Sequence, residues 1–311
     1  MRRTHSVACL AGDGTGPELM AEACRTLHSV ARVHGFVVED VHVPFGSEAL
    51  TRSGHPLPQA TRSAYLEADA VLVAALDEPA LAGVESELDL RARLTRVVHR
   101  RGAFTLLSPA GADSERWTVE RAFAVARRSR GRLASVDPDD AWAALADEVG
   151  DSHAGVDVEH LSVRDGLEAL AFEPQRFDVL VTGQQLSRLL DDVAALLERD
   201  GRVVACGRLA ASGPSIFAPA EADGRELAGS GVVDPCPMLL AASLLLAEGL
   251  GEARAGETLA GALTAARSVG ADPVASVRRT LAASTRELAD AVLRLLPVSH
   301  RGAEFVPEAL A

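Results

Sequence analysis

Short apolar runs of strand length alternate along this chain with longer segments in which apolar residues recur every three or four positions. The runs indicate buried strands, and the spacing indicates amphipathic helices. Their alternation favours an α/β protein with a largely parallel sheet. The sequence predicts strands at 6–11, 36–43, 70–75, 132–136, 156–161, 177–182, 203–206 and near 217. It predicts helices at 19–30, 59–67, 118–129, 140–149, 184–197, 237–248, 256–266 and 285–296.

The length and the apolar content indicate a globular protein. A chain of 311 residues is long enough for one large domain or two moderate ones. No apolar run approaches the roughly 20 residues that a membrane span needs, and the first residues lead into no secretory apolar segment. We therefore expect a cytoplasmic protein with no membrane partner.

The charge of the chain bears on its partners. The formal net charge is −13, and the sequence contains no basic cluster and no stripe of aromatic and basic residues. Binding to a nucleic-acid backbone depends on concentrated positive charge. We therefore expect a small-molecule partner and no nucleic acid.

The chain contains no lysine, so all 31 basic residues are arginine, and Tyr65 is its single tyrosine. Mechanisms that depend on a lysine amine are excluded, among them Schiff-base chemistry and the lysine of a phosphate-binding loop. Arginine cannot replace lysine in these roles because it keeps its proton near neutral pH.

The cysteines and histidines match no reactive motif. Cys9, Cys24, Cys206 and Cys236 are scattered, with no C-x-x-C pair and no cysteine–histidine cluster in the sequence. This distribution favours buried reduced thiols over a zinc site or a nucleophile. None of the nine histidines pairs with a serine or cysteine in a recognisable nucleophile motif, which argues against a hydrolase.

Five segments, in chain order, resemble the characteristic motifs of the isocitrate/isopropylmalate dehydrogenase family. They are LAGDGTGPE at 10–18, LDLRARL at 88–94, ASVD at 134–137, FDVLVTG at 177–183 and LAGSGVVDP at 227–235. A glycine-rich turn between a strand and a helix is a moderate signal by itself, and its spacing is not that of a Rossmann fingerprint. The collinear set spans nearly the whole chain, so we identify the protein as a divergent member of this family.

The resemblance implies a two-domain isopropylmalate-dehydrogenase-like fold with an interdomain cleft. The first domain would comprise residues 1–100 and 204–311, and the second would be inserted at 101–203. It also implies a homodimer, with contacts through the predicted helices at 184–197 and 237–248. Family members oxidise and decarboxylate a 2-hydroxy acid with NAD(P) and Mg²⁺ or Mn²⁺.

The substrate and acid–base positions depart from the family pattern. The substrate arginines correspond to Glu85 and Thr95, and the lysine that follows the S-V-D strand corresponds to Pro138. The family segment with the catalytic tyrosine is reduced to FTLLSPAG at 104–111. The arginines near the lost substrate positions remain ligand-binding candidates, although they are out of register: Arg91, Arg93 and Arg96.

The metal positions have changed charge. The three metal-binding aspartates of the family correspond to Arg164, Arg188 and Asp192, so Asp192 is the only retained ligand. Two guanidinium groups repel a hard divalent cation, and we expect no metal. Arg164 and Arg188 are instead candidates for an anion clamp with Asp192 beside them. The alternative is that they neutralise Asp192 or the neighbouring carboxylates of Asp165 and Asp191.

The nucleotide-binding loop has also diverged. Its position is occupied by EADGRE at 221–226, and Asp234 replaces an asparagine that contacts the adenine side of the cofactor. The altered loop positions are Glu221, Asp223, Arg225 and Asp234. Additional carboxylates beside a pyrophosphate weaken its binding. We expect no cofactor; NAD and Mg²⁺ or Mn²⁺ would be needed only by an oxidoreductase.

Three functions remain open on sequence grounds. The first is a repurposed homologue that binds a small anionic carboxylate metabolite or acts on it without redox chemistry. The second is a divergent NAD(P)-dependent oxidoreductase of a 2-hydroxy acid. The third is a non-catalytic partner subunit that assembles with an active paralogue.

These departures predict that the purified protein does not reduce NAD or NADP with isocitrate, isopropylmalate, malate or tartrate, with or without Mg²⁺ or Mn²⁺. The measurement is the absorbance of the reduced cofactor over time. Turnover on any of these substrates in the common enzyme range of about 1 to 10³ s⁻¹ would contradict the prediction.

Overall fold

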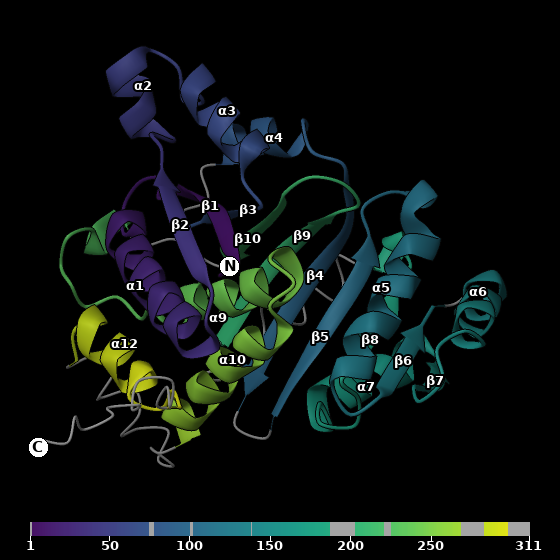
Figure 1. Cartoon of the computed structure of the whole chain (residues 1–311). Helices are drawn as coiled ribbons and strands as arrows, with labels where there is room; N and C mark the ends of the chain where they lie inside the picture. The colour runs from purple at the N-terminus through teal and green to yellow at the C-terminus, as the bar shows by residue number, and fades with distance from the viewer. Residues whose placement is uncertain are drawn as a thin grey trace, which may run out of the picture.

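The computed structural model describes residues 2–74, 78–99, 102–137, 139–186, 203–220, 225–268 and 283–297. The chain forms an α/β protein (Figure 1). Its strands are β1 (Thr4–Leu10), β2 (Val37–His42), β3 (Ala70–Val73), β4 (Leu90–His99), β5 (Gly102–Pro109), β6 (Arg132–Val136), β7 (Asp157–Leu161), β8 (Val179–Thr182), β9 (Val203–Ala210) and β10 (Ser215–Pro219).

Its helices are α1 (Gly16–His34), α2 (Ser47–Ser53), α3 (Gln59–Glu67), α4 (Glu78–Glu85), α5 (Glu115–Arg128), α6 (Asp140–Gly150), α7 (Val163–Phe172), α9 (Cys236–Leu244), α10 (Ala253–Ser268) and α12 (Thr285–Leu293). Single turns η1 (Ala112–Ser114) and η2 (Arg225–Leu227) are 3-10 helical, and η3 (Leu245–Gly249) continues α9 as a π-helix. Within the described residues, no helix combines the length and the apolar character that a membrane crossing needs.

All ten strands belong to one sheet, in the order β2-β1-β3-β10-β9-β4-β5-β8-β6-β7. The pairs of β4 with β5 and β9, and of β9 with β10, are antiparallel, and the remaining pairs are parallel. The predicted largely parallel α/β sheet is therefore confirmed. The order also places the strands of 1–100 and 203–219 together on one side and those of 102–182 on the other, although the division into two domains stays a prediction.

The sequence missed β4 and β5, the two long strands that cross the middle of the sheet (Figure 1). The β4 segment contains arginines at positions 91, 93 and 96 between apolar residues. Its apolar residues therefore do not alternate regularly with polar ones, and the segment lacks the sequence pattern of a strand. The antiparallel ladders to β5 and β9 satisfy its backbone in an extended form. Helices α2, α4 and α7 were not predicted either, and the predicted helix at 184–197 lies largely outside the described residues.

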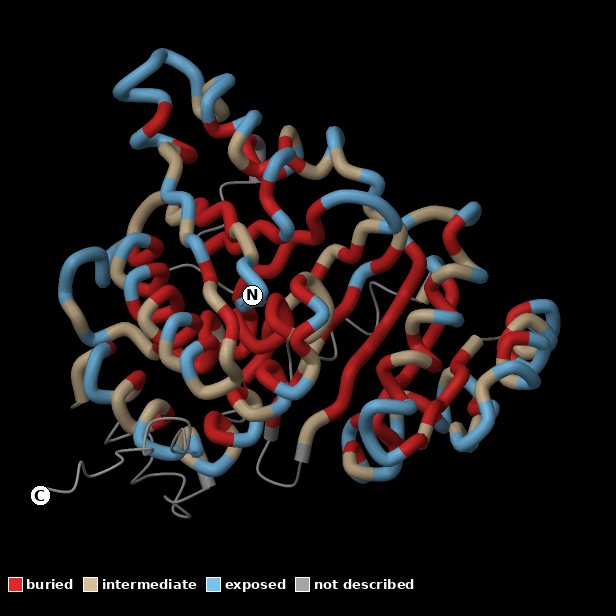
Figure 2. Tube along the Cα trace, viewed as in Figure 1, coloured by how far each residue is buried: buried red, intermediate tan, exposed pale blue. Residues whose placement is uncertain are grey.

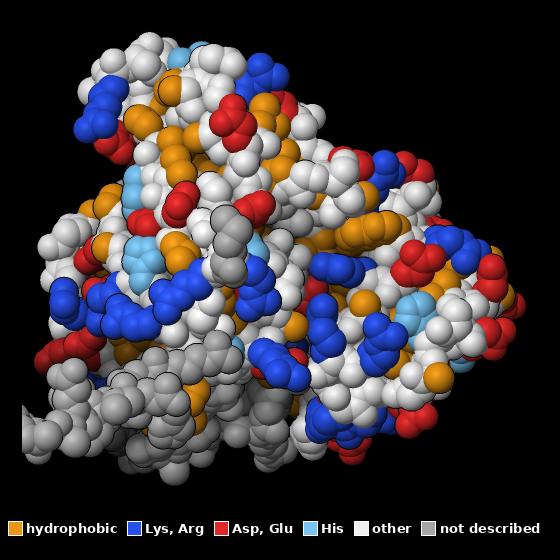
Figure 3. Space-filling model, in the orientation of Figure 1, with side chains coloured by type: hydrophobic (Ala, Val, Ile, Leu, Met, Phe, Trp, Pro, Cys, Tyr) orange, Lys and Arg blue, Asp and Glu red, His pale blue; other side chains and the backbone are white. Residues whose placement is uncertain are grey.

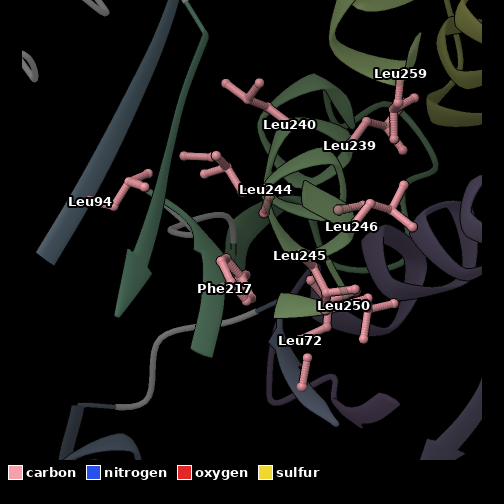
Figure 4. Packing of buried hydrophobic residues seen from close by; sticks show 14 of the residues in the cluster. Leu72, Leu94, Phe217, Leu239, Leu240, Leu244, Leu245, Leu246, Leu250 and Leu259 are labelled. Atoms are coloured by element: carbon pink, nitrogen blue, oxygen red, sulfur yellow. The ribbon is translucent and has the colours of Figure 1, made fainter. Parts of the chain in front are cut away.

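One face of the sheet, the α9 face, is covered by α1, α5, α9 and α10. Its buried cluster includes Leu72 and Leu94 from the sheet, Phe217 from β10 and the leucines of α9 (Figure 4). Long stretches of the strands are buried, as the red segments of Figure 2 show. Burial of so much apolar surface is the main favourable contribution to folding.

The opposite face, the α7 face, carries two separate apolar clusters. The first joins β1, β3 and β10 to α3 and α4, with Phe45 and Tyr65 at its centre. The second joins β4, β5, β6, β8 and β9 to α7, and its buried residues include Phe104 and Phe177. Strand β4 reaches both clusters, since Leu90 packs against the first and Val97 belongs to the second. On the surface drawn in Figure 3, arginine side chains are interspersed with aspartate and glutamate side chains.

Helix α9 is apolar on all sides because it is buried within the chain. Every residue from Met238 to Leu244 is buried, and α9 packs against β9, β10, α1 and α10. The sequence-based explanation of these apolar residues as a dimer surface is therefore unnecessary for this helix. A homodimer itself stays a prediction.

The contact between α10 and α9 gives a stability prediction. A Cβ atom at Gly256 would lie 2.5 Å from the carbonyl oxygen of Ser243 and 2.8 Å from the Cβ atom of Ala247. Because the first neighbour is backbone, Gly256→Ala should lower the free energy of unfolding by about 1 to 3 kcal/mol.

Gly261→Ala in the same helix is the matched control. A Cβ atom there meets nothing within 4 Å, so helix propensity alone should raise stability by up to about 1 kcal/mol. Urea denaturation of both variants measures the difference, and equal effects would contradict the close packing at Gly256.

Candidate ligand-binding site

A polar patch occupies the middle of the α7 face, between the two apolar clusters. Alternate residues of a strand point to opposite faces of the sheet. In β4, Ala92 and Leu94 point into the core of the α9 face, so Arg93 and Thr95 point to the α7 face. The same alternation applies to β5 and β9, whose Leu106 and Val204 belong to the α7-face cluster. The central polar patch consists of Arg93, Thr95, Ser108, Cys206 and Arg208.

The strand register places these side chains side by side. Arg93 is directly opposite Arg208 of β9 on one side and Ser108 of β5 on the other. Cross-strand partners have Cβ atoms about 4.5 to 5.5 Å apart, and like charges in such a pair are destabilising. The patch therefore concentrates positive charge that an anion would neutralise.

The two arginines differ in their partners. Arg208 forms an ion pair with Glu85 at the end of α4, with Nε 2.7 Å from Oε1, and both side chains are partly buried. Arg93 is exposed, and it forms no ion pair among the residues that the structure describes. Arg93 is thus the cation of the patch that is available to a ligand.

Arg91 lies at the edge of the patch and is already paired. Its Nε lies 2.7 Å from Asp89 Oδ1, and its Nη1 lies 2.7 Å from Asp113 Oδ2. The pairing of β4 with β9 is interrupted at this arginine by a register shift between Leu90 and Ala92. It ties the loop before β4 to the turn after β5.

Arg96 lies on the opposite face from Arg93. Its Nη1 donates to Thr105 Oγ1 over 2.7 Å, and it lines a cavity of about 60 Å³ together with Arg128, Glu248 and residues of α10. Burial lowers the pKa of its guanidinium, with Glu248, Asp178 and Glu257 opposing the shift. The pleat of β4 therefore places two of the three candidate arginines, Arg93 and Arg96, on opposite faces of the sheet, and their role in ligand binding stays a prediction.

Arg164 lies in the first turn of α7, on the patch's side of the sheet. Its side chain is 86% exposed, and its Nε lies 3.3 Å from Glu168 Oε1 in the next turn. Asp165, one of its predicted partners, instead hydrogen-bonds the capping residue Ser162. Arg188, Asp192 and Asp191 lie outside the described residues, so the predicted clamp stays a prediction.

The single tyrosine has a structural role. Tyr65 is fully buried in α3, and its hydroxyl donates to Glu87 Oε2 over 2.5 Å. Burial and this hydrogen bond raise the pKa of the Tyr65 phenol well above its usual value. Tyr65 therefore supplies no acid–base group to the patch.

Of the altered nucleotide-loop residues, Asp234 is engaged within the chain. Its carboxylate accepts from the backbone N–H of Cys236 at 2.9 Å and forms an ion pair with Arg267 at 3.1 Å. Glu221 and Asp223 lie outside the described residues, and only the backbone of Arg225 is described, at the start of η2.

The first and last of the five motifs meet in space. Gly12 and Gly14 have positive φ angles of 65° and 63°, which favour glycine at this turn. The carboxylate of Glu18, in the first turn of α1, accepts from the backbone N–H of Gly231 at 3.1 Å. Asp13 accepts from the Ser47 hydroxyl at 2.6 Å. These acids thus join the turn to neighbouring loops.

The sequence profile of the isocitrate/isopropylmalate dehydrogenase family matches residues 6–112 and 100–292. The chain belongs to this family. It is 30% identical to a 3-isopropylmalate dehydrogenase of Salinibacter ruber, with 98% of each chain covered. It is 28% identical to a 3-isopropylmalate dehydrogenase of Synechococcus sp. strain CC9605, with 84% of this chain and 90% of the relative covered.

Solved structures confirm the family fold. A β-decarboxylating dehydrogenase from Thermococcus kodakarensis superposes with a TM-score of 0.75 at 19% identity, covering 94% of this chain and 96% of that one. An isocitrate dehydrogenase from Methylococcus capsulatus superposes with a TM-score of 0.73 at 19% identity, covering 94% and 99%. The α/β fold expected from the five motifs is therefore the one that this chain adopts.

Of the three positions that the sequence aligns with metal-binding aspartates of the family, only Arg164 lies among the described residues. The guanidinium of Arg164 offers donors and no lone pair, and hard divalent ions require oxygen ligands. Arg164 forms an ion pair with Glu168, one helical turn away. Position 164 therefore offers no ligand to a divalent ion.

Sequence reasoning missed Arg208 and did not single out Cys206 as a patch residue. The segment VVACGRLA at 203–210 carries its polar side chains at every second position, which is the signal of a strand with one solvent-facing side. The partner strand β4 was not predicted, so this signal could not place Arg208 opposite Arg93.

Proposed function

We propose that this protein binds a small anionic carboxylate metabolite at the central polar patch, without a metal ion, and does not catalyse metal- and NAD-dependent oxidative decarboxylation. The observation that carries the proposal is the cross-strand pair of Arg93 and Arg208 between two apolar clusters. Only one of these two cations is paired with a carboxylate of the described chain.

The chemistry of the patch suits a carboxylate. A guanidinium group presents parallel N–H donors that match the two oxygens of a carboxylate. Arg93 would make the first contact because it is exposed. Arg208 would strengthen the local positive charge, and Glu85 would compete with the ligand for it. The hydroxyls of Thr95 and Ser108 flank the arginines on the same face.

The residues around the patch also support the absence of redox chemistry. The chain has no lysine to act as a general base. Tyr65 is buried in α3 and hydrogen-bonded to Glu87. The sequence aligns Arg164 with a metal-ligand position of the family, where a cation opposes metal binding. Hydride transfer to NAD would therefore lack the base that removes the hydroxyl proton of the substrate and the metal ion that stabilises the carbonyl group of the product.

A divergent dehydrogenase is the second candidate. The similarity to 3-isopropylmalate dehydrogenases over more than four fifths of the chain favours it. Formation of reduced cofactor with a 2-hydroxy acid distinguishes this candidate from the first. A partner subunit of an active paralogue would instead co-purify with that paralogue.

The proposal predicts that di- and tricarboxylates raise the melting temperature of the protein equally with and without EDTA. A ligand at 100 times its Kd adds about 2.7 kcal/mol of stability. Arg93→Ala should remove most of this shift while the melting temperature of the unliganded protein stays within about 2 °C, because Arg93 is an exposed residue. Calorimetric titration with citrate and malate measures the affinities.

Glu85→Gln should act in the opposite direction. It frees Arg208 from its partner while it preserves the shape of the side chain. Citrate affinity should rise about two- to fivefold, the order expected for a partly exposed ion pair. Arg176→Ala is the control, because Arg176 pairs with Glu159 at the far edge of the sheet. Equal effects of Arg93→Ala and Arg176→Ala would refute the proposed site.

The same titration tests the predicted clamp of Arg164 and Arg188. If both contact the ligand, Arg188→Ala and Arg164→Ala should each abolish the stabilisation by anions and leave the protein folded. If they only neutralise nearby carboxylates, anion binding will persist in both variants, and Arg188→Ala will lower stability in the absence of ligand.

A further inference from the structure

Two cysteines and a histidine that are distant in the sequence meet on the α9 face, away from the central polar patch. Cys9 lies in β1, Cys24 in α1 and His42 in β2. The sulfur atoms of Cys9 and Cys24 are 3.7 Å apart, and the sulfur of Cys24 lies 3.9 Å from His42 Nε2. Cys9 and Cys24 are free and buried, as the sequence predicts, but the fold brings these distant residues together beside His42.

The cluster follows from the register of the sheet. Cys9 and His42 are partners in the parallel pair of β1 and β2, so their side chains share one face. Asp40 lies two residues before His42 and points to that face as well. Helix α1 packs over these strands (Figure 1), and the side that it buries includes Cys24. Strands β1 and β2 and helix α1 therefore each contribute one side chain to the cluster.

The distances match those of a tetrahedral zinc site. Zinc binds thiolate sulfur at about 2.3 Å and histidine nitrogen at about 2.0 to 2.1 Å. Tetrahedral angles then separate two sulfur ligands by about 3.8 Å, and a sulfur from a nitrogen by about 3.6 Å. The sulfur–sulfur separation of 3.7 Å matches the first value. The sulfur–nitrogen separation of 3.9 Å is slightly longer than the second, so the His42 ring would move a short way toward a bound ion.

Asp40 lies close enough to supply a fourth ligand. Asp40 Oδ2 lies 2.9 Å from His42 Nε2, and the other oxygen of Asp40 lies 2.8 Å from His28 Nε2. The thiols are buried, whereas the His42 side chain is 54% exposed, which gives an ion a path from solvent. A carboxylate or a water molecule at the fourth position completes the tetrahedron.

We propose that Cys9, Cys24 and His42 bind one zinc ion, with Asp40 at or beside the fourth position. Binding replaces two S–H bonds with two S–Zn bonds and releases two protons to the solvent. The ion fastens α1 and the edge strand β2 to β1. This site is independent of the proposed anion site, because it lies on the other face of the sheet.

The test is zinc content and cobalt substitution of the intact, reduced protein. After incubation with zinc chloride and gel filtration, the wild type should retain one zinc ion per chain by mass spectrometry of the metal. Cobalt should give the near-ultraviolet absorption of a thiolate complex and the visible bands of a tetrahedral ion. Zinc should also raise the melting temperature.

Cys24→Ser should lose zinc, and Cys236→Ser, a buried cysteine outside the cluster, should retain it. His42→Ala keeps the test valid if Cys24→Ser fails to fold, because His42 is exposed; its zinc affinity should fall at least about tenfold. Zinc content well below one per chain in the wild type, or equal content in the wild type and His42→Ala, would overturn the proposal. Citrate binding should be unchanged in His42→Ala.

Discussion

The pairing of β4 with β9 on one side and β5 on the other is the interaction on which the rest of the structure depends. These antiparallel ladders join the strands of residues 1–100 and 203–219 to those of residues 102–182 in one sheet. The pleat of β4 then divides its side chains. Leu94 and Val98 enter the core of the α9 face, and Arg93 and Thr95 remain between the two apolar clusters of the α7 face.

The same register places two arginines, a destabilising like-charged pair, opposite each other on the middle strands of the sheet. Arg93 and Arg208 are directly opposite, and one carboxylate, Glu85, neutralises only one of them. Elsewhere the buried carboxylates are well paired: Asp178 accepts from the backbone N–H and the Nε of Arg130, and Glu248 contacts Arg121 and Arg128. Local conflicts of this kind are expected where a protein binds something.

The interactions that maintain the family fold in this chain do not involve the side chain of Arg164. The turn glycines Gly12 and Gly14, and the contact of Glu18 with Gly231, preserve the junctions of the fold. These interactions depend on backbone shape. A guanidinium at position 164 leaves the backbone of α7 intact, since that side chain is exposed. The fold therefore does not by itself decide which chemistry the chain performs.

The sequence by itself determined the α/β class, the family and most helices and strands, because apolar periodicity and glycine-rich turns are local signals. It also determined that no lysine chemistry is available. Tertiary structure decided which side chains meet. Arg93 and Arg96 are neighbours in sequence and lie on opposite faces, whereas Arg93 and Arg208, or Cys9, Cys24 and His42, are distant in sequence and lie together. The physical reason is strand register, which a one-residue shift would invert and which only pairing between distant strands fixes.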